Sequence, residues 1–248
     1  MAFLARTVTR DMKIRGTREC QSCGATWSYY ETGTPSCPSC GSLRSVGLDE
    51  TRQEHTDTSP DLEIAGIRQR LGDESIAAVS DELKTRLRSY IRKRGFISGG
   101  ELQPLDSRYL AASELLYATD LVARRRQPTD AEQLFVFALI EAAETGEWPP
   151  DEEIPQSLAA ARGLAVADAV AAYRRELRTW LDEHPDPAVR STLGSLRDQC
   201  KRAEALQGDI PPGTATGLVS AARGIGQYLR TDDETALAAA QDRLQRLD

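Results

Sequence analysis

The sequence predicts a mainly α protein, in which a small three-stranded β module at the N-terminus is followed by an all-α domain of about seven or eight helices. Two observations carry this prediction. Four of the five cysteines in the 248-residue chain lie between residues 20 and 40, a density typical of small metal-stabilised β folds. From residue 61 onward, apolar residues recur with the period of an α-helix, and no run of alternating β-branched residues interrupts them.

The cysteines form two CxxC pairs that are separated by 13 residues, and a glycine follows each pair. A CxxC turn directs two sulfur atoms to one point, and two such turns close a tetrahedron around an ion. Glycine lets the backbone turn there with a positive φ angle. We therefore predict one closed, structural Zn²⁺ site, while a rubredoxin-like iron site, which uses similar turns, remains the main alternative. The predicted ligands are Cys20, Cys23, Cys37 and Cys40.

The residues beside and between the two pairs predict the strands of this module. We expect residues 13–19 and 43–48 to pair as strands before the first pair and after the second. Between them, Trp27 and Tyr29 are expected on one face of a strand and Tyr30 on the other. A module of this size buries too little apolar area to fold alone, so metal binding is expected to supply much of its folding free energy. The residues expected to bind a partner are Trp27, Tyr29, Tyr30 and Arg44.

Residues 12–48 resemble the zinc ribbons of the transcription-factor-IIB type. The resemblance rests on Cys20-x-x-Cys23-Gly24, on Cys37-Pro38-x-Cys40-Gly41 and on the aromatic residues after the first pair. The combination with a helical C-terminal region is also similar to uncharacterised haloarchaeal zinc-ribbon proteins. Ribbons of this type serve transcription, translation, RNA processing and protein contacts alike, so the resemblance implies a metal-binding ribbon and no single activity.

We divide the chain into an N-terminal extension (1–11), the ribbon (12–48), a polar linker (49–60) and the helical domain (61–248). Met12 is an alternative start of the chain. His55, alone in the linker, is expected to be solvated. Because the chain has no apolar run of 18 residues and no secretory signal, we expect a cytoplasmic protein without membrane contact. Cys200 lies on an apolar stripe and is expected to be a buried, inert thiol.

In the helical domain, stripes of apolar residues at helical spacing predict the positions of the helices. These stripes lie at residues 61–71, 76–91, 105–123, 166–181, 189–203, 218–229 and 237–247. Residues 134–140 are apolar on every side and are expected to form the most buried helix. Residues that favour helix starts occur at Thr129–Asp130, Asp186–Pro187 and Thr231–Asp232.

Charge is distributed unevenly along the chain. Residues 61–248 carry 31 acidic and 24 basic residues, and the bias of 27 arginines against four lysines suits a halophilic archaeal host. Residues 84–94 nevertheless hold six basic residues and no acidic one, and such a face can neutralise phosphates. The alternative interpretation is structural, because Tyr90 belongs to the apolar stripe and cations are favoured near a helix C-terminus. The candidate nucleic-acid-binding residues are Lys84, Arg86, Arg88, Arg92, Lys93 and Arg94, with Arg124, Arg125 and Arg126 at the end of another helix.

Three functions follow from these patterns, in order of preference. The first is a zinc-stabilised, non-enzymatic adaptor that binds a macromolecular partner, for which we expect a protein rather than a nucleic acid, with a role in transcription or RNA metabolism. The second is direct nucleic-acid binding through the basic helix. The third is an enzyme with a pocket in the helical domain, although neither His55 nor His184 lies in a catalytic motif and no phosphate-binding loop occurs. We expect His184 to cap a helix, and Trp148 to pack within its acidic loop rather than dock a basic partner.

Overall fold

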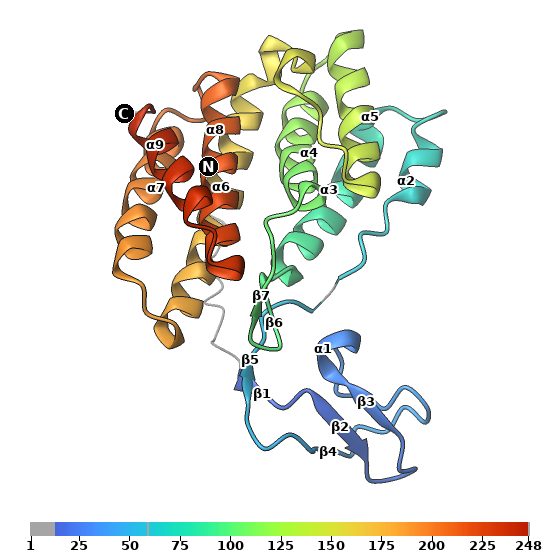
Figure 1. Ribbon diagram of the computed structural model, residues 1–248. Coiled ribbons are helices and arrows are strands. Elements are labelled where there is room, and N and C mark those ends of the chain that lie inside the picture. Colours follow the sequence, from blue (N-terminus) through green and yellow to red (C-terminus); the bar gives the residue numbers. More distant parts are fainter. Residues whose placement is uncertain (1–12, 59, 248) are drawn as a thin grey trace. The chain divides into compact units, whose positions relative to one another are not determined.

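The computed structural model describes residues 13–58 and 60–247 and confirms the predicted fold class (Figure 1). Its helices and strands form two units. One unit combines the chain up to residue 60 with residues 93–101, and the other contains residues 61–92 and 102–248. The predicted extension 1–11 and the alternative start at Met12 lie outside the described residues.

The ribbon is a three-stranded antiparallel sheet, as predicted. Strand β2 (Thr17–Cys20) lies between β3 (Thr26–Ser28) and β4 (Ser45–Gly47). Arg18 stands opposite Trp27 on β3 and opposite Gly47 on β4. Because side chains alternate along a strand, this register places Arg18, Cys20 and Trp27 on one face and Glu19 with Val46 on the other.

The segment after β3 differs from the prediction. Tyr29 and Tyr30 do not continue the strand but form a single helical turn, α1 (Tyr29–Thr32). The turn ends at Gly33, whose left-handed φ of 60° lets its amide bond back to the Tyr29 carbonyl. The two tyrosines therefore do not alternate across a strand, and both rings lie beside that of His55.

Residues 49–60, predicted to be a polar linker, contain a strand and buried side chains. Strand β5 (Gln53–Glu54) pairs antiparallel with β1 (Lys13–Ile14). The amides of Thr56 and Asp57 both donate to the Ile97 carbonyl, at 2.9 and 3.2 Å. Ile97 begins the short hairpin of β6 (Ile97–Ser98) and β7 (Glu101–Leu102), so this part of the ribbon unit is built by a segment 40 residues further along the chain.

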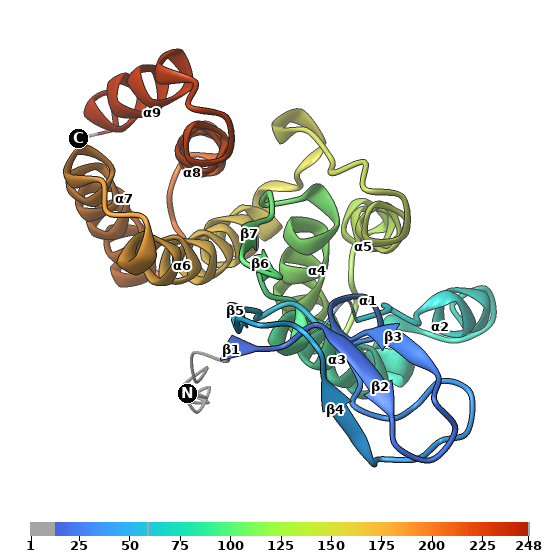
Figure 2. The same ribbon diagram turned by 60° about the horizontal axis from the view of Figure 1, so that its bottom comes forward.

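The helical unit confirms the predicted stripes as eight helices within residues 61–247. The helices are α2 (Ala65–Arg70), α3 (Ile76–Lys93), α4 (Ser107–Ala123), α5 (Asp130–Thr145), α6 (Ala159–Glu183), α7 (Pro187–Ala205), α8 (Pro212–Thr231) and α9 (Glu234–Gln245), with short 3₁₀ turns η1 (Asp151–Glu153) and η2 (Gln156–Leu158). The longest helix, α6, packs against α4, α7 and α8, as Figure 2 shows. In the part of the chain that the structure describes, no helix is long and apolar enough to cross a membrane.

The residues that cap the helices are close to those that the sequence predicts. Thr129 and Glu132 form a reciprocal capping box at the start of α5, and Asp186 caps α7 through the amide of Val189. The start of α9 lies slightly later than predicted, because Asp233 supplies its cap and Asp232 ends α8 in a left-handed conformation.

The prediction that residues 134–140 form the most buried helix is wrong. Leu134 on α5 is 67% exposed, whereas its neighbours Phe135 and Val136 are buried. Helix α4 instead buries the larger share of its residues, with ten of 17 buried. An apolar composition on every side identifies a helix that contacts the core, but not how many of its faces are covered.

A buried polar network holds the loop after α5 to the helices. Arg162 on α6 pairs with Glu114 on α4 through atoms 2.8 Å apart, and these side chains are 1% and 0% exposed. The guanidinium lies 4.1 Å from the ring centre of Trp148, and the indole nitrogen donates to Glu114 at 2.7 Å. The Pro149 carbonyl accepts from Arg162 at 2.9 Å. Trp148 is thus packed within its loop, as predicted.

We expect Arg162→Ala to lower the free energy of unfolding by about 3–5 kcal/mol, because it leaves the buried Glu114 carboxylate without its cation. Denaturant unfolding of the full chain, followed by far-UV circular dichroism, measures this loss. The matched control is Arg178→Ala on the same helix, where the side chain is exposed and the expected change is within about 0.5 kcal/mol. Equal effects of the two variants would contradict a special role of the network.

Candidate metal centre

Two similar backbone turns build the candidate metal centre. In the first, the Gly24 amide donates to the Cys20 carbonyl at 2.9 Å, and in the second the Gly41 amide donates to the Cys37 carbonyl at 2.8 Å. The two glycines have φ angles of 74° and 72°. A methyl group would meet nothing within 4 Å at either position, so glycine is required there for backbone conformation and not for space.

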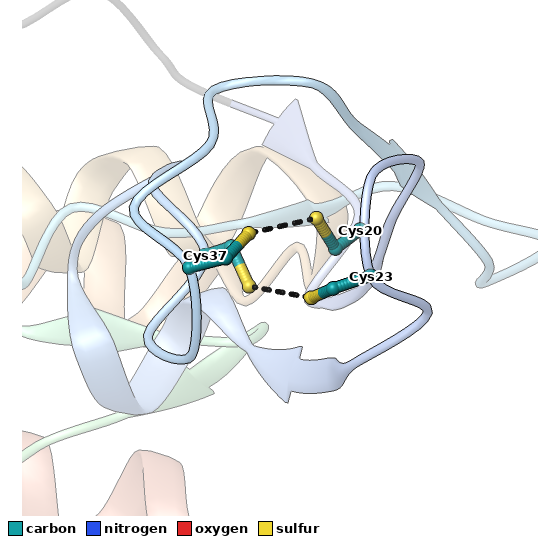
Figure 3. Close-up of side chains that lie close together, drawn as sticks. Cys20, Cys23 and Cys37 are labelled. Carbon is teal, nitrogen blue, oxygen red and sulfur yellow. Dashed lines mark hydrogen bonds between the residues drawn. The ribbon is translucent and has the colours of Figure 1, made fainter.

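The turns bring the four cysteine sulfurs together, as the sequence predicts (Figure 3). All four atoms lie within 4.8 Å of one another, and the Cys20–Cys40 and Cys23–Cys37 sulfur pairs are each 3.6 Å apart. Zinc–sulfur bonds of about 2.3 Å in a regular tetrahedron place the sulfurs about 3.8 Å apart. The observed spacing therefore fits one tetrahedral metal ion held by all four cysteines.

The four thiols cannot all ionise without a cation. The Ser22 amide, which donates to the Cys20 sulfur at 3.3 Å, is the largest influence that lowers the pKa of Cys20 to about 6. At Cys40 the Ser42 amide also lowers the pKa, but the neighbouring sulfurs of Cys23 and Cys20 together raise it to about 12. A divalent ion removes this conflict, because its charge stabilises all four thiolates at once.

The inner half of the centre is part of a small core. Cys20 and Cys37 are buried and pack with Trp27, whereas Cys23 and Cys40 are exposed. The Trp27 indole nitrogen donates to the Thr34 carbonyl at 3.3 Å and so ties the core to the loop before the second turn. The metal site and the core of the ribbon therefore depend on each other.

Of the aromatic residues that we predict to bind a partner, one is buried in the ribbon core and two are half-buried beside His55. Trp27 is only 8% exposed. Tyr30 donates its hydroxyl to the Ile14 carbonyl at 3.0 Å and is half-buried, as is Tyr29. Of the four predicted residues, only Arg44 is exposed.

Sequence reasoning also missed a buried histidine. His55, expected to be solvated, has no exposed surface and lies beside Tyr30 and Tyr29, with ring centres 4.9 and 5.7 Å away. Its Nδ1 accepts the Gly99 amide at 3.2 Å, so the imidazole is neutral with its proton on Nε2. Burial lowers the pKa of His55, and the nearby Asp57 only partly offsets this effect.

The predicted basic helix is partly neutralised by acidic residues. Lys84 pairs with Asp81 and Asp120, Arg86 with Glu82, and Arg94 with Asp57. Among the described residues, Arg88, Arg92 and Lys93 are exposed without an ion pair. At the end of α4, Arg124 pairs with Asp120 and Arg125 with Glu132, whereas Arg126 has no ion pair with any residue that the structure describes.

The remaining predicted residues behave as expected. Cys200 is buried, and burial raises its pKa to about 12, so the thiol is inert at neutral pH. His184 ends α6 and stacks on Trp180 with ring centres 3.9 Å apart.

Comparison with known protein families gives a match over most of the chain. A family model described as "Family of unknown function (DUF7117)" matches residues 12–244, which includes both the metal centre and the helical unit. No curated protein and no solved structure matches the chain.

We expect Cys37→Ser to abolish metal binding and unfold the ribbon while the helices of residues 61–247 persist. The serine hydroxyl is a poor metal ligand, and the substitution also removes a buried side chain from the ribbon core. Elemental analysis would show less than a tenth of the bound metal, with most of the far-UV helical signal retained. A matched control is Cys200→Ser, which should keep the metal. Loss of the helical signal in Cys37→Ser would contradict the independence of the two units.

We expect acid to destabilise the ribbon unit through His55. Its pKa is lower in the folded state than the unfolded value of about 6.5, so its contribution is fully present above that pH and is lost as pH falls toward the folded pKa. The control His55→Asn keeps an acceptor for the Gly99 amide but does not titrate. The protection factor of the Gly99 amide, which removes the intrinsic slowing of exchange by acid, should fall more in the wild type than in His55→Asn between pH 7 and pH 5, with metal content monitored. An equal fall of the protection factor in His55→Asn would contradict the assignment.

Proposed function

The chain belongs to the DUF7117 family, whose function is unknown, and we propose that it is a zinc-stabilised, non-enzymatic adaptor whose ribbon binds a protein partner. The proposal has two parts: the chemistry of the metal centre and the surface that the folded ribbon presents. Each rests on its own observation.

The metal centre supports a structural role for zinc. Four cysteine sulfurs surround one point, so a bound ion has no coordination position left for a substrate or a reactive water. Four thiolates in a tetrahedron suit Zn²⁺, the ion that most often fills such sites. The two turns and the strand order β3-β2-β4 also support a ribbon of the transcription-factor-IIB type, and the arginine bias supports a halophilic archaeal host.

The observation that carries the adaptor role is an exposed group of aliphatic side chains on the ribbon. Leu43, Val46 and Leu48 are 71%, 42% and 48% exposed. They are three of the six large apolar side chains that are exposed in the described chain, and they lie within six residues. Exposed aliphatic residues this close together in the chain support the proposal that a partner covers this surface. We call these three residues the aliphatic patch.

The structure gives less support to nucleic-acid binding. Only Arg88, Arg92 and Lys93 of the basic helix are exposed without an acidic neighbour, so the cluster is smaller than the sequence suggests. Phosphate contacts also weaken steeply with salt, which disfavours them in the halophilic host that we propose.

We expect elemental analysis of the purified full chain to find one zinc ion per molecule. Iron in its place, recognisable by its visible absorption, would overturn the assignment of the metal. Substoichiometric zinc that rises to one equivalent on titration would agree with it.

We expect the variant Leu43→Ser/Val46→Ser/Leu48→Ser to lose a protein that the tagged wild-type chain retains in native lysate. The matched control is Leu134→Ser, which removes an equally exposed leucine from the helical unit. Quantitative mass spectrometry should show at least a tenfold loss of that protein in the triple variant and none in the control, with equal zinc content in all three chains. Retention of every bound protein by the triple variant would overturn the adaptor role of the ribbon.

A further inference from the structure

We propose that helices α6 and α7 form a binding site for a phosphate group, made by Arg174, Arg178 and Arg197. The site lies in the helical unit and uses no residue of the ribbon, so the inference goes beyond the proposed adaptor function. Three observations carry it: the level at which the two helices place these arginines, the enclosed position of Arg174, and the charges around it.

The pairing of α6 and α7 brings arginines of both helices to the same level. The two helices pack against each other and are joined by residues 184–186 (Figure 2). Close to this connection, Arg190 on α7 donates to the Leu181 carbonyl on α6 at 2.7 Å. Seven residues, or two helical turns, from these positions lie Arg197 on α7 and Arg174 on α6. The two guanidinium groups therefore belong to one edge of the helix pair.

The Arg174 side chain is held in place by packing. Its Nε is buried and has no hydrogen-bond partner among the described residues, whereas the side chain as a whole is half-buried, so its terminal nitrogens reach the surface. Arg178 follows one turn later on the same face of α6 and is exposed. A guanidinium that packing already holds loses little conformational freedom when a ligand binds to its outer nitrogens.

The charges closest to Arg174 belong to other arginines. Burial has the largest effect in lowering the pKa of Arg174, and the guanidinium groups of Arg178, Arg197 and Arg175 lower it further. Neither Arg174 nor Arg178 forms an ion pair with a residue that the structure describes, and Arg197 pairs only with its exposed neighbour Asp198, at 2.8 Å. Guanidinium groups held together repel one another, so an anion between them is favoured.

Other acidic residues of α6 and α7 are engaged elsewhere or lie further away. Asp168 accepts a tyrosine hydroxyl of α4, and Glu176 lies near another tyrosine of that helix. Asp182 pairs with an arginine close to the connection between α6 and α7, at 3.0 Å. Glu204 lies two turns beyond Arg197, about 10 Å along α7. The excess of positive charge at the three arginines is therefore local, although the helical unit as a whole is acidic.

Three guanidinium groups from two helices match a phosphate group better than a carboxylate. A phosphate monoester offers three acceptor oxygens and nearly two negative charges at neutral pH, whereas a carboxylate offers two oxygens and one charge. The phosphodiesters of a nucleic acid carry one charge each and follow one another along a strand, so they suit a row of cations more than a cluster. The ligand that the cluster fits is therefore inorganic phosphate or a phosphate monoester.

Isothermal titration calorimetry of the full chain with inorganic phosphate, above pH 7 and at constant salt, tests the inference. We expect one phosphate ion to bind per chain. Arg174→Met and Arg197→Met should each weaken binding at least tenfold, because each removes one of the three guanidinium groups. The matched control Arg126→Met removes an exposed arginine elsewhere in the helical unit and should leave binding unchanged. Acetate should bind at least tenfold more weakly than phosphate.

Thermal unfolding provides a second measurement, which distinguishes binding from a structural role of Arg174. Phosphate should raise the unfolding temperature of the wild type and of Arg126→Met, but not that of Arg174→Met. Without phosphate, Arg174→Met should be at least as stable as the wild type, because it removes a repelled charge and a buried donor without an acceptor.

A peptide with one phosphoserine, measured beside inorganic phosphate, identifies the source of the phosphate group. Binding at least tenfold tighter than that of phosphate would indicate a phosphorylated protein segment, and equal binding would indicate a small phosphorylated molecule. Both results agree with the proposed site.

Absence of phosphate binding, equal binding by the wild type and Arg197→Met, or acetate that binds as tightly as phosphate would overturn the inference. So would single-stranded RNA without terminal phosphates that binds more tightly than phosphate and is lost in Arg174→Met. None of these results concerns the aliphatic patch, so the adaptor function is tested separately by lysate capture.

Discussion

The meeting of four cysteine sulfurs is the constraint on which the ribbon depends. Its three strands contain ten residues in all, and its buried apolar cluster consists of Trp27 and two of the cysteines themselves. Such a core is too small to hold a sheet together by burial alone. We therefore expect a bound metal ion to supply, through metal–thiolate bonds, the folding free energy that the few apolar contacts do not, so that any surface of the ribbon depends on that ion.

The sequence predicted the parts of the structure that local chemistry determines. The ligands follow from the CxxC spacing, since the turn geometry is fixed by a few residues on each side. The helical stripes and the caps at Thr129 and Asp186 are equally local, because they depend on neighbours within two turns. These features can be predicted without knowing which residues pack against them.

The features that the sequence did not predict all depend on contacts between residues that are far apart in the chain. His55 is buried because Gly99 and two tyrosines of the ribbon turn surround it, and nothing in its flanking sequence indicates them. Trp27 was predicted to bind a partner, but its side chain packs against Cys20 and Cys37 in the ribbon core. Residues 43–48 could be predicted to contain a strand, yet only the fold shows that Leu43, Val46 and Leu48 stay exposed.

Residues 93–101, which belong to the ribbon unit, restrict how the gene for this protein can be recombined. The ribbon unit takes residues from both sides of α3, so the chain leaves it and returns to it. A gene fragment that ends at residue 60 would encode the metal ligands but not the backbone that donates to His55 or accepts from Thr56. The ribbon therefore cannot be transferred to another protein as one continuous gene segment. Recombination that moved the ribbon without the hairpin would separate the ribbon from part of its own unit. Ribbon and helices are expected to be inherited together, as a family match that runs through both also suggests.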